Sequence, residues 1–390
     1  ARGSRETPLY TYESILEFSE GSQAAAFGEK YRQYEAPGRR LARLPRPPYL
    51  FMSRITAIDA RQWQLEAGGT IEAEYDVPPT EWYFGANRQR LMAYCVLNEI
   101  VLQPCGWFAA YLGSALHCPF DTRFRNLGGR ATVHVPIARD VGTLTTRVKI
   151  TDVSAAGGMI VERFKYELFG GGQLICSGDT YFGFFSDAAL AQQVGLRDVA
   201  ERTYTPTPAD LARHTPVMLE RTAPLTPNAD AGEFPHAATL PGAALLMLDE
   251  IDLFLPDGGP HGLGFVRGVK HVNPQDWFFE AHFYEDPVWP GSLGLEAFLQ
   301  TLKVFARERW GEAVCNSHEF APILIGSPHE WTYRGQVIPT DKRVEVEASI
   351  TAISDEARTI RADGLLKVNG LPIYEMRDFG VQLIPSAEIR

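Results

Sequence analysis

The feature that most constrains the fold is an internal repeat, because a repeat means that one domain occurs more than once in the chain. VPPTEWYF (77–84) resembles NPQDWFF (273–279). Aligning these stretches places Trp82 opposite Trp277, an offset of 195 residues (277 − 82). A similarity of this length is weak alone, so the repeat depends on further matches in the same order.

A second pair of stretches repeats at almost the same offset. AYCVLNEIVLQ (93–103) aligns with PGSLGLEAFLQ (290–300), which places Glu99 opposite Glu296, 197 residues apart (296 − 99). Three further pairs follow the same order along the chain: LFMSRITAID with LLMLDEIDLF, ITDVS with ITAIS, and SGDTYFGFF with YEMRDFGVQLI. Together the five matches predict two copies of a single domain.

The repeat divides the chain into four parts. Residues 1–46 form an N-terminal arm, 47–186 the first copy, 187–241 a linker and 242–390 the second copy. The linker contains TPTPAD and APLTPNADAGEFP, and such proline-rich, polar composition is typical of segments between domains. We therefore expect two similar domains joined by irregular chain.

Within each copy, the apolar pattern predicts one long helix and several antiparallel strands. Residues 291–308 carry apolar side chains close to helical spacing, and 94–116 is the counterpart in the first copy. The aromatic runs at 82–84 and 277–279 are expected to be strands, and alternating runs such as KRVEVEASITAI follow each helix. An antiparallel sheet wrapped around a central helix is an α+β hotdog domain. Two copies predict a double hotdog, a pseudo-dimer in one chain.

Composition argues against several classes of function. The 390 residues are 45% hydrophobic and 22% charged, as in globular domains with buried cores. The net charge of −11 argues against a nucleic-acid or membrane-surface partner, and no apolar run is long enough to predict a membrane span. The five cysteines are irregularly spaced without a CxxC pair, so we expect neither a metal site nor disulfides, in a reducing, cytoplasmic setting.

The second copy contains a motif suited to catalysis. NPQDWFFEAHFYEDPVWPGSLGLEAFLQ (273–300) resembles the active-site segment of the bacterial β-hydroxyacyl-ACP dehydratases, whose dehydratase/isomerase branch has W-F-F-x-x-H-F-x-x-D-P-V-x-P-G-x-L-G-L-[DE]-A. YTYESILEF near the N-terminus, GQVIPTDKRVEV and the closing IYEMRDFGVQL are also similar to that branch. The tandem form most resembles the dehydratase domains of polyunsaturated fatty acid synthases, which are polyketide-synthase-like multienzymes.

The resemblance implies a hydro-lyase that removes water from a β-hydroxyacyl thioester, and the residue types suit this reaction. His282 would take the α-proton, since the pKa of histidine lies near neutrality. Gly291 and its neighbour Ser292 would stabilise the thioester oxygen through N–H groups at a helix N-terminus, where Pro290 suits the first turn. In the family, the backbone carbonyl of the residue matching Val288 holds the His ring.

The acid that protonates the leaving hydroxyl is expected to be a buried glutamate with a raised pKa. Glu296 is the nearest in sequence to His282, but the homodimeric enzymes of the family take the His and the acid from different protomers. Two copies in one chain then predict that His282 works with Glu99, while Glu296 remains the alternative acid. Gln103, one helical turn after Glu99, would orient its carboxyl. Asn87 aligns with His282, so a second, vestigial site lacks its base.

The resemblance also implies partners, namely acyl carrier protein and other synthase domains. The phosphopantetheine arm of the carrier would deliver the substrate, and no metal or other cofactor is expected. Arg123, Arg125 and Arg130 form a local basic cluster on an acidic chain. Either a solvated loop or a docking surface for the acidic carrier explains this cluster. The double hotdog is expected to be a monomer or a homodimer of it.

Three other functions, two catalytic and one non-catalytic, remain open from the sequence. The resemblance to the isomerase branch implies that the same base and acid could also move the double bond. A hotdog thioesterase would need a carboxylate that activates water, without the His–Pro-Gly–Glu arrangement. A non-catalytic module that binds acyl chains or organises a synthase is the third, since the first copy has already lost a catalytic residue.

Overall fold

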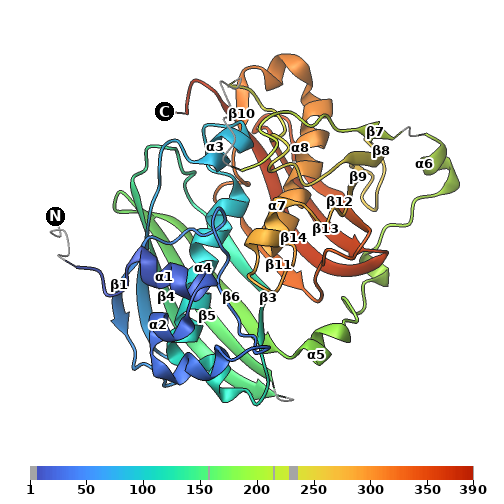
Figure 1. Cartoon of the computed structure of the whole chain (residues 1–390). Coiled ribbons are helices and arrows are strands. Elements are labelled where there is room, and N and C mark those ends of the chain that lie inside the picture. Colours follow the sequence, from blue (N-terminus) through green and yellow to red (C-terminus); the bar gives the residue numbers. More distant parts are fainter. Residues whose placement is uncertain (1–6, 157–158, 214–215, 228–235, 390) are drawn as a thin grey trace.

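The computed structural model describes residues 7–156, 159–213, 216–227 and 236–389, whose strands form one antiparallel sheet in two halves (Figure 1). The first half contains β1 (Arg54–Asp59), β2 (Thr70–Asp76), β3 (Arg123–Val133), β4 (Thr143–Ala156), β5 (Met159–Gly170) and β6 (Gln173–Phe185). The second half contains β8 (Glu250–Leu255), β9 (Phe265–His271), β11 (Pro328–Tyr333), β12 (Arg343–Ser354), β13 (Thr359–Val368) and β14 (Leu371–Pro385), with the short β10 (His318–Phe320) paired to β14.

The two halves have the same strand order. The first runs β1-β2-β4-β5-β6-β3 toward the junction between the halves. The second, leaving aside the added edge strand β7, runs β8-β9-β12-β13-β14-β11 toward the same junction. They meet where β3 pairs with β11, with Gly129 opposite Trp331. A side chain at Gly129 would lie 2.6 Å from the Trp331 ring, so this junction requires glycine. The predicted repeat is confirmed, and its two sheets are joined edge to edge.

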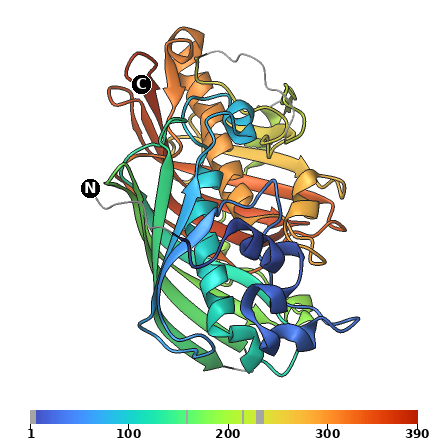
Figure 2. The same cartoon turned by 60° about the vertical axis from the view of Figure 1, so that its left-hand side comes forward.

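One long helix lies against each half of the sheet. α4 (Tyr94–Leu112) packs on β2, β4 and β5, and α8 (Gly291–Cys315) packs on β9, β12, β13 and β14. Figure 2 shows α4 lying across the strands of the first half. α4 is buried along almost its whole length, and so is α8 as far as Ala306, which explains why these stretches are largely apolar, whereas α8 is exposed and charged at 307–309. The α+β double hotdog expected from the sequence is confirmed.

A glutamine fixes each central helix to the segment that leads into the first strand of its half. The side-chain oxygen of Gln103 accepts from the Phe51 N–H at 2.8 Å, and its Nε2 donates to the Tyr49 carbonyl at 2.8 Å. Gln300 makes the same two bonds to the corresponding segment of the second copy. The shared Gln of the repeat therefore has a structural role in both copies.

The two aromatic runs expected to be strands are short helices, α3 (Trp82–Asn87) and α7 (Trp277–Ala281), so that prediction was wrong. The indole rings of Trp82 and Trp277 meet edge to face, with their centroids 5.2 Å apart. Each indole N–H also donates to a backbone carbonyl in the segment that precedes the first strand of the same copy, Pro48 before β1 and Ala244 before β8. This packing between the copies outweighs the strand propensity of aromatic residues.

The N-terminal arm covers α4 on the side away from the sheet (Figure 2). It contains α1 (Tyr12–Glu20), α2 (Gln23–Phe27) and the 3₁₀ helix η1 (Glu29–Tyr34). The Tyr31 hydroxyl donates to the Ala110 carbonyl of α4 at 2.7 Å. The arm thus completes the burial of the first copy's helix, although it precedes the repeat.

The linker follows the outside of the second half (Figure 1). It contains α5 (Asp187–Ala191), η3 (Ala200–Arg202), α6 (Pro208–Ala212) and β7 (Val217–Met218), and a further 3₁₀ helix, η2 (Ser114–His117), follows α4. β7 pairs with β8 and extends the edge of the sheet. None of the helices in the described ranges is long and apolar enough to span a membrane.

Candidate active site

His282 immediately follows α7, and its ring is fixed by the backbone of the next loop. Its Nδ1 lies 3.1 Å from the Val288 carbonyl oxygen, and the Val288 N–H donates back to the His282 carbonyl at 2.8 Å. Since a carbonyl only accepts, Nδ1 carries the proton and Nε2 keeps its lone pair. Burial lowers the pKa of His282 to about 3, so the imidazole is neutral near pH 7.

Arginines of the first copy hold the loop between His282 and Val288. Arg125 donates to both carboxylate oxygens of Asp286, at 2.8 and 2.9 Å, and Arg123 lies 3.5 Å from the same carboxylate. Such a two-bond contact fixes both the distance and the orientation of its partners. The first half of the sheet therefore positions the histidine of the second half.

These contacts correct the interpretation of the basic cluster at Arg123, Arg125 and Arg130. The side chains of Arg123 and Arg125 are only 7% and 12% exposed and are ion-paired, so they are not part of an exposed basic surface. Arg130 is exposed but lies 3.7 Å from Glu330. The partner carboxylates are far away in sequence, which is why the cluster looked free. The structure gives no exposed docking cluster at these three positions.

Glu99 lies on α4 and belongs to the same site. Its side chain is buried, and its two carboxylate oxygens accept from Ser292 Oγ at 2.6 Å and from Gln103 Nε2 at 2.9 Å. The Tyr49 hydroxyl lies 2.9 Å from Ser292 Oγ and extends this chain of hydrogen bonds. Burial raises the pKa of Glu99, while the two donated hydrogen bonds act in the opposite direction. The carboxyl is therefore suited to hold a proton and then release it.

The first turn of α8 borders this carboxyl. Pro290 caps the helix, and its carbonyl accepts from the N–H groups of Leu293 and Gly294. The N–H groups of Gly291 and Ser292 lie before these donors and have no acceptor within the helix. They are free to stabilise a negative oxygen, as the resemblance implied for these two positions.

These groups line one pocket with about 720 Å³ of empty space, part of it open to solvent. Its polar end includes His282, Glu99 and Ser292. Its apolar wall includes Leu44, Leu102, Gly106, Phe124, Phe182 and Trp289. Convergent polar groups beside an apolar wall are typical of a small-molecule site. In the described part of the chain, no group of three His, Cys, Asp or Glu could hold a metal ion.

The corresponding position of the first copy keeps a similar contact without an imidazole. Asn87 donates through Nδ2 to the Leu91 carbonyl at 2.8 Å, much as His282 contacts Val288. The connection is four residues long (91 − 87) in the first copy and six (288 − 282) in the second. The structure therefore supports the alignment of Asn87 with His282 across a two-residue length difference.

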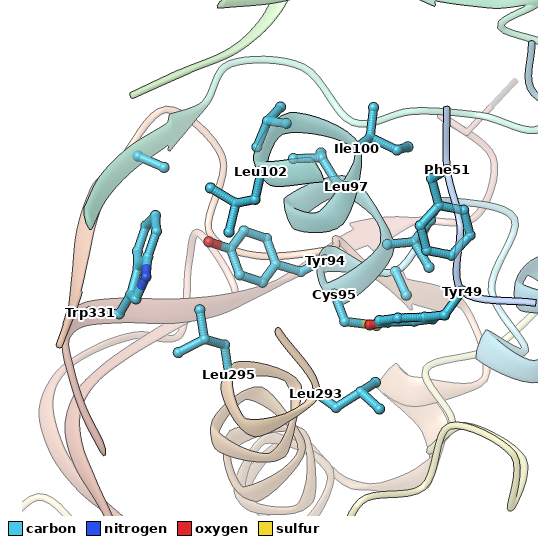
Figure 3. Packing of buried hydrophobic residues seen from close by; sticks show 14 of the residues in the cluster. Tyr49, Phe51, Tyr94, Cys95, Leu97, Ile100, Leu102, Leu293, Leu295 and Trp331 are labelled. Atoms are coloured by element: carbon cyan, nitrogen blue, oxygen red, sulfur yellow. The ribbon is translucent and has the colours of Figure 1, made fainter. Parts of the chain in front are cut away.

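The first turn of α4 also differs from that of α8. With the two glutamates aligned, Tyr94 corresponds to Gly291, at an offset of 197 (291 − 94). The Tyr94 ring is buried, and its hydroxyl lies 2.5 Å from His329 Nε2. Figure 3 shows this ring between the start of α4, Leu295 and Trp331. A bulky side chain thus occupies the helix end that is bare in α8.

Glu296, the alternative acid, is not in the His282 pocket. Its side chain is buried and Oε1 accepts from Lys303 Nζ at 2.8 Å, while Oε2 has no hydrogen-bond partner among the described residues. Lys303 corresponds to Gly106 of the first copy, at an offset of 197 (303 − 106). The structure therefore brings His282 together with Glu99 and leaves Glu296 with a lysine.

Sequence reasoning missed several residues of these two sites, among them Lys303, Asp286 and Tyr49. Lys303 lies seven residues after Glu296, two helical turns on, so a shared helix face was a signal for their contact. Asp286 lies inside the recognised motif, but its arginine partners come from the other copy. Tyr49 precedes the first strand of the repeat, and no pattern around it indicates a contact with the second copy.

A family model covers both halves of this fold. The model described as the FabA-like domain matches residues 44–179 and again residues 240–377. The two matches together cover more than half of the chain and follow its two structural repeats. The chain belongs to the FabA-like domain family, with two copies of the hotdog domain in one polypeptide.

A curated relative has the same tandem region within a longer protein. This relative, a polyunsaturated fatty acid synthase subunit from Thraustochytrium sp., is 30% identical over 396 residues. The match covers 96% of this chain but only 26% of that protein, so the chain spans about a quarter of the relative's length. The similarity to polyunsaturated fatty acid synthases inferred from the sequence is thereby confirmed.

Some solved structures resemble this chain at low sequence identity and with modest TM-scores. The dehydratase domain of RzxB from Pseudomonas fluorescens has a TM-score of 0.46 at 13% identity, over 86% of this chain and 98% of that one. The dehydratase domain from the CurJ module of Curacin polyketide synthase has a TM-score of 0.43 at 8% identity, over 85% and 96%. An oleoyl thioesterase from Lactobacillus plantarum also has 0.43, at 10% identity over 82% and 98%. Similarities at this level do not discriminate between reactions.

Proposed function

We propose that this chain is a β-hydroxyacyl-ACP dehydratase, which converts a carrier-bound β-hydroxyacyl thioester into a 2-enoyl thioester and water. The observation that carries the proposal is the pocket shared by His282 and Glu99 beside the N-terminus of α8. One group is a neutral imidazole and the other a buried carboxyl with a raised pKa. This is the base and acid pair that the elimination requires.

The elimination uses the two groups in opposite directions. His282 Nε2 takes the α-proton, and the electrons of that C–H bond form the Cα–Cβ double bond as the Cβ–oxygen bond breaks. Glu99 gives its proton to the departing hydroxyl, which leaves as water. The N–H groups of Gly291 and Ser292 stabilise the negative charge that develops on the thioester oxygen. Exchange with solvent then returns the proton from His282 to Glu99.

The neighbouring residues prepare each group for its role. The Val288 carbonyl keeps the proton of His282 on Nδ1, so Nε2 is available from the start. Ser292 and Gln103 donate to Glu99 and stabilise the carboxylate that remains after proton transfer. These hydrogen bonds hold His282 and Glu99 in place before substrate binds, and such preorganisation lowers the barrier.

The apolar wall of the pocket is suited to the acyl chain. Gly106 on α4 leaves space beside Phe124, where any side chain would narrow the pocket. We place the reaction in a cytoplasmic synthase of the polyunsaturated fatty acid or polyketide type, with an acyl carrier protein and other domains as partners. Isomerisation of the enoyl product would use the same base and acid at a neighbouring carbon.

The test is the reverse reaction, hydration of a crotonyl or 2-decenoyl thioester, with products separated by chromatography. We expect wild type to hydrate the substrate and His282→Ala to lower the rate by about 10³-fold, within the range for removal of a catalytic base. His261→Ala, at an exposed histidine, is the matched control and should keep full activity. Chromatography also shows directly whether 3-enoyl or 2-cis isomers form.

Other outcomes would contradict the proposal in different ways. Release of free thiol at a rate above that of hydration would indicate a thioesterase. Binding of the thioester without conversion, even when it is presented on a carrier protein, would indicate a non-catalytic acyl-binding module. Full activity in His282→Ala would show that the base is another residue.

A further inference from the structure

The hydroxyl of Tyr333 is a polar group for which the proposed mechanism has no use. Tyr333 ends β11 and lines the pocket of His282 and Glu99. Its side chain is buried, and the hydroxyl has no hydrogen-bond partner among the described residues. A buried hydroxyl without a hydrogen-bond partner destabilises the folded protein, so a phenylalanine would be the more stable choice here. The hydroxyl is therefore available to donate a hydrogen bond to an acceptor on a bound ligand.

The position of Tyr333 indicates which acceptor this is. A Cβ atom added to Gly291 would lie 3.0 Å from the Tyr333 hydroxyl and 2.9 Å from its ring. The hydroxyl thus lies directly over the first residue of α8, beside the free N–H groups of that helix end. The indole N–H of Trp289, which also lines the pocket, is likewise buried without a partner among the described residues. Donors gather at this end of the pocket and lack an acceptor.

The protonation state of the Tyr333 hydroxyl is that of a hydrogen-bond donor. Burial, followed by the nearby Tyr374, Tyr94 and Glu99, raises the pKa of Tyr333 well above its ordinary value. The phenol therefore keeps its proton. The Tyr374 ring packs against it with the centroids 4.4 Å apart, which limits the directions in which Tyr333 can turn.

We propose that Tyr333 donates a hydrogen bond to the thioester oxygen of the bound acyl group, together with the N–H groups at the start of α8. This inference rests on the proposed dehydration and deepens it by assigning a further substrate-binding residue. The donor is fixed before substrate arrives, and its bond strengthens as negative charge builds up on the oxygen.

The other copy shows the opposite arrangement. There Tyr94 occupies the position of Gly291, and its hydroxyl already has a partner in His329. That helix end therefore lacks the bare first turn over which Tyr333 lies in α8. Of the two helix ends, both within the described ranges, the one in the His282 pocket combines a bare N-terminus with an unpartnered phenol.

The first arm of the test compares Tyr333→Phe with Tyr166→Phe. Tyr166 on β5 also has a buried hydroxyl without a partner among the described residues, but it lies outside the His282 pocket. Both variants should be at least as stable to heat as wild type. We expect only Tyr333→Phe to lower kcat for 2-enoyl thioester hydration, by about 10²- to 10³-fold, as for loss of an oxyanion donor. Unchanged activity in Tyr333→Phe, or equal losses in both variants, would overturn the inference.

The second arm measures binding without turnover by titration calorimetry. The probes are the decanoyl thioester of N-acetylcysteamine, which has no β-hydroxyl to eliminate, and the decyl thioether, which lacks the carbonyl. Tyr333→Phe should weaken thioester binding by about 3- to 10-fold, the value of one neutral hydrogen bond, and leave thioether binding unchanged. Equal effects on both probes would mean that Tyr333 acts through shape. If wild type hydrates no thioester, the dehydratase proposal fails, and this arm still decides the role of Tyr333.

Discussion

The two halves of the molecule share one strand order and one helix arrangement, yet their helix N-termini have different chemistry. α8 starts with Gly291 and leaves its first N–H groups accessible, while α4 starts with the buried Tyr94. Before the helix, one copy has His282 and the other Asn87. A duplicated fold thus keeps its architecture through packing between the halves, while of these two described helix starts only that of α8 follows a histidine.

The two glutamates also differ between the halves, in the groups that donate hydrogen bonds to them. Glu99 accepts from two neutral donors, Ser292 and Gln103, and lines the pocket. Glu296 accepts from the ammonium group of Lys303 and lies outside it. A glutamate held by neutral donors can cycle between acid and carboxylate, whereas one paired with a buried cation is a structural charge pair. In the proposed mechanism, the degenerate copy therefore still supplies the acid for the His282 site.

The largest effect expected from this contrast concerns the two glutamates. Glu99→Gln keeps the shape of the side chain but can neither take a proton from the attacking water nor give one to the leaving hydroxyl, so hydration of 2-decenoyl thioester should fall by about 10²- to 10³-fold. Glu296→Gln is the matched control in the other copy and should keep the activity within about 2-fold. The rates are compared for folded protein, checked by circular dichroism.

A reversed result would break the comparison. If Glu296→Gln is inactive and Glu99→Gln is active, the histidine works with the acid of its own copy or of another chain. Equal losses would mean that both carboxyls affect the reaction, and the argument from crossed copies would then fail. Only the loss confined to Glu99→Gln is consistent with one site built from both halves.

The next effect is on stability and concerns Lys303. Lys303→Met leaves Glu296 buried without its cation, and breaking such a pair costs about 3 kcal/mol or more. The double variant Glu296→Gln/Lys303→Met removes both charges and should recover most of the loss. Urea unfolding measures both values, and catalytic rates at low denaturant should stay near wild type. A double variant no better than Lys303→Met would show that the pair acts through packing of the lysine chain.

The third effect is on the enzyme's preference for the length of the acyl chain. It concerns Gly106, the counterpart of Lys303. A Cβ at this position would lie 3.0 Å from the Phe124 ring, so Gly106→Leu narrows the pocket from the α4 side. We expect kcat/KM for 2-decenoyl thioester to fall by about 10-fold and that for crotonyl thioester to change little. The short substrate is the internal control. Equal losses for both substrates would place the acyl chain elsewhere.

The repeat and the motif made much of the candidate site predictable. The offset between the copies led to His282, Glu99 and Asn87, because hydrophobic and aromatic patterns survive duplication even where catalytic residues change. Periodicity predicted a helix over 291–308 and the repeat predicted its counterpart over 94–116, whereas α8 continues to Cys315 and α4 ends at Leu112. Contacts between segments that are distant in the sequence were harder to predict. The aromatic runs, which fold into α3 and α7 and not into strands, are an example.

The charged residues show where the sequence was insufficient. Arg123 and Arg125 looked like a free basic cluster, but Asp286 reaches them only when β3 lies beside the His282 loop. Tyr333 gave no signal at all, since an aromatic residue at a strand end is usually core. Its missing hydrogen-bond partner becomes visible only when every neighbouring acceptor has been placed.

The smallest effect is a shift in pH dependence that reports on how Glu99 is held. Activity should fall with rising pH as Glu99 loses its proton, and fall at low pH only as His282, with its pKa lowered to about 3, gains one. Ser292 donates to Glu99 and favours the carboxylate, so Ser292→Ala raises the pKa of Glu99 further. The alkaline limb of kcat/KM should therefore move up by about 1 pH unit, the value of one hydrogen bond to a charged group. A shift to lower pH would mean that Ser292 instead accepts a hydrogen bond from the protonated carboxyl, and an unmoved limb would assign the alkaline limb to a group other than Glu99.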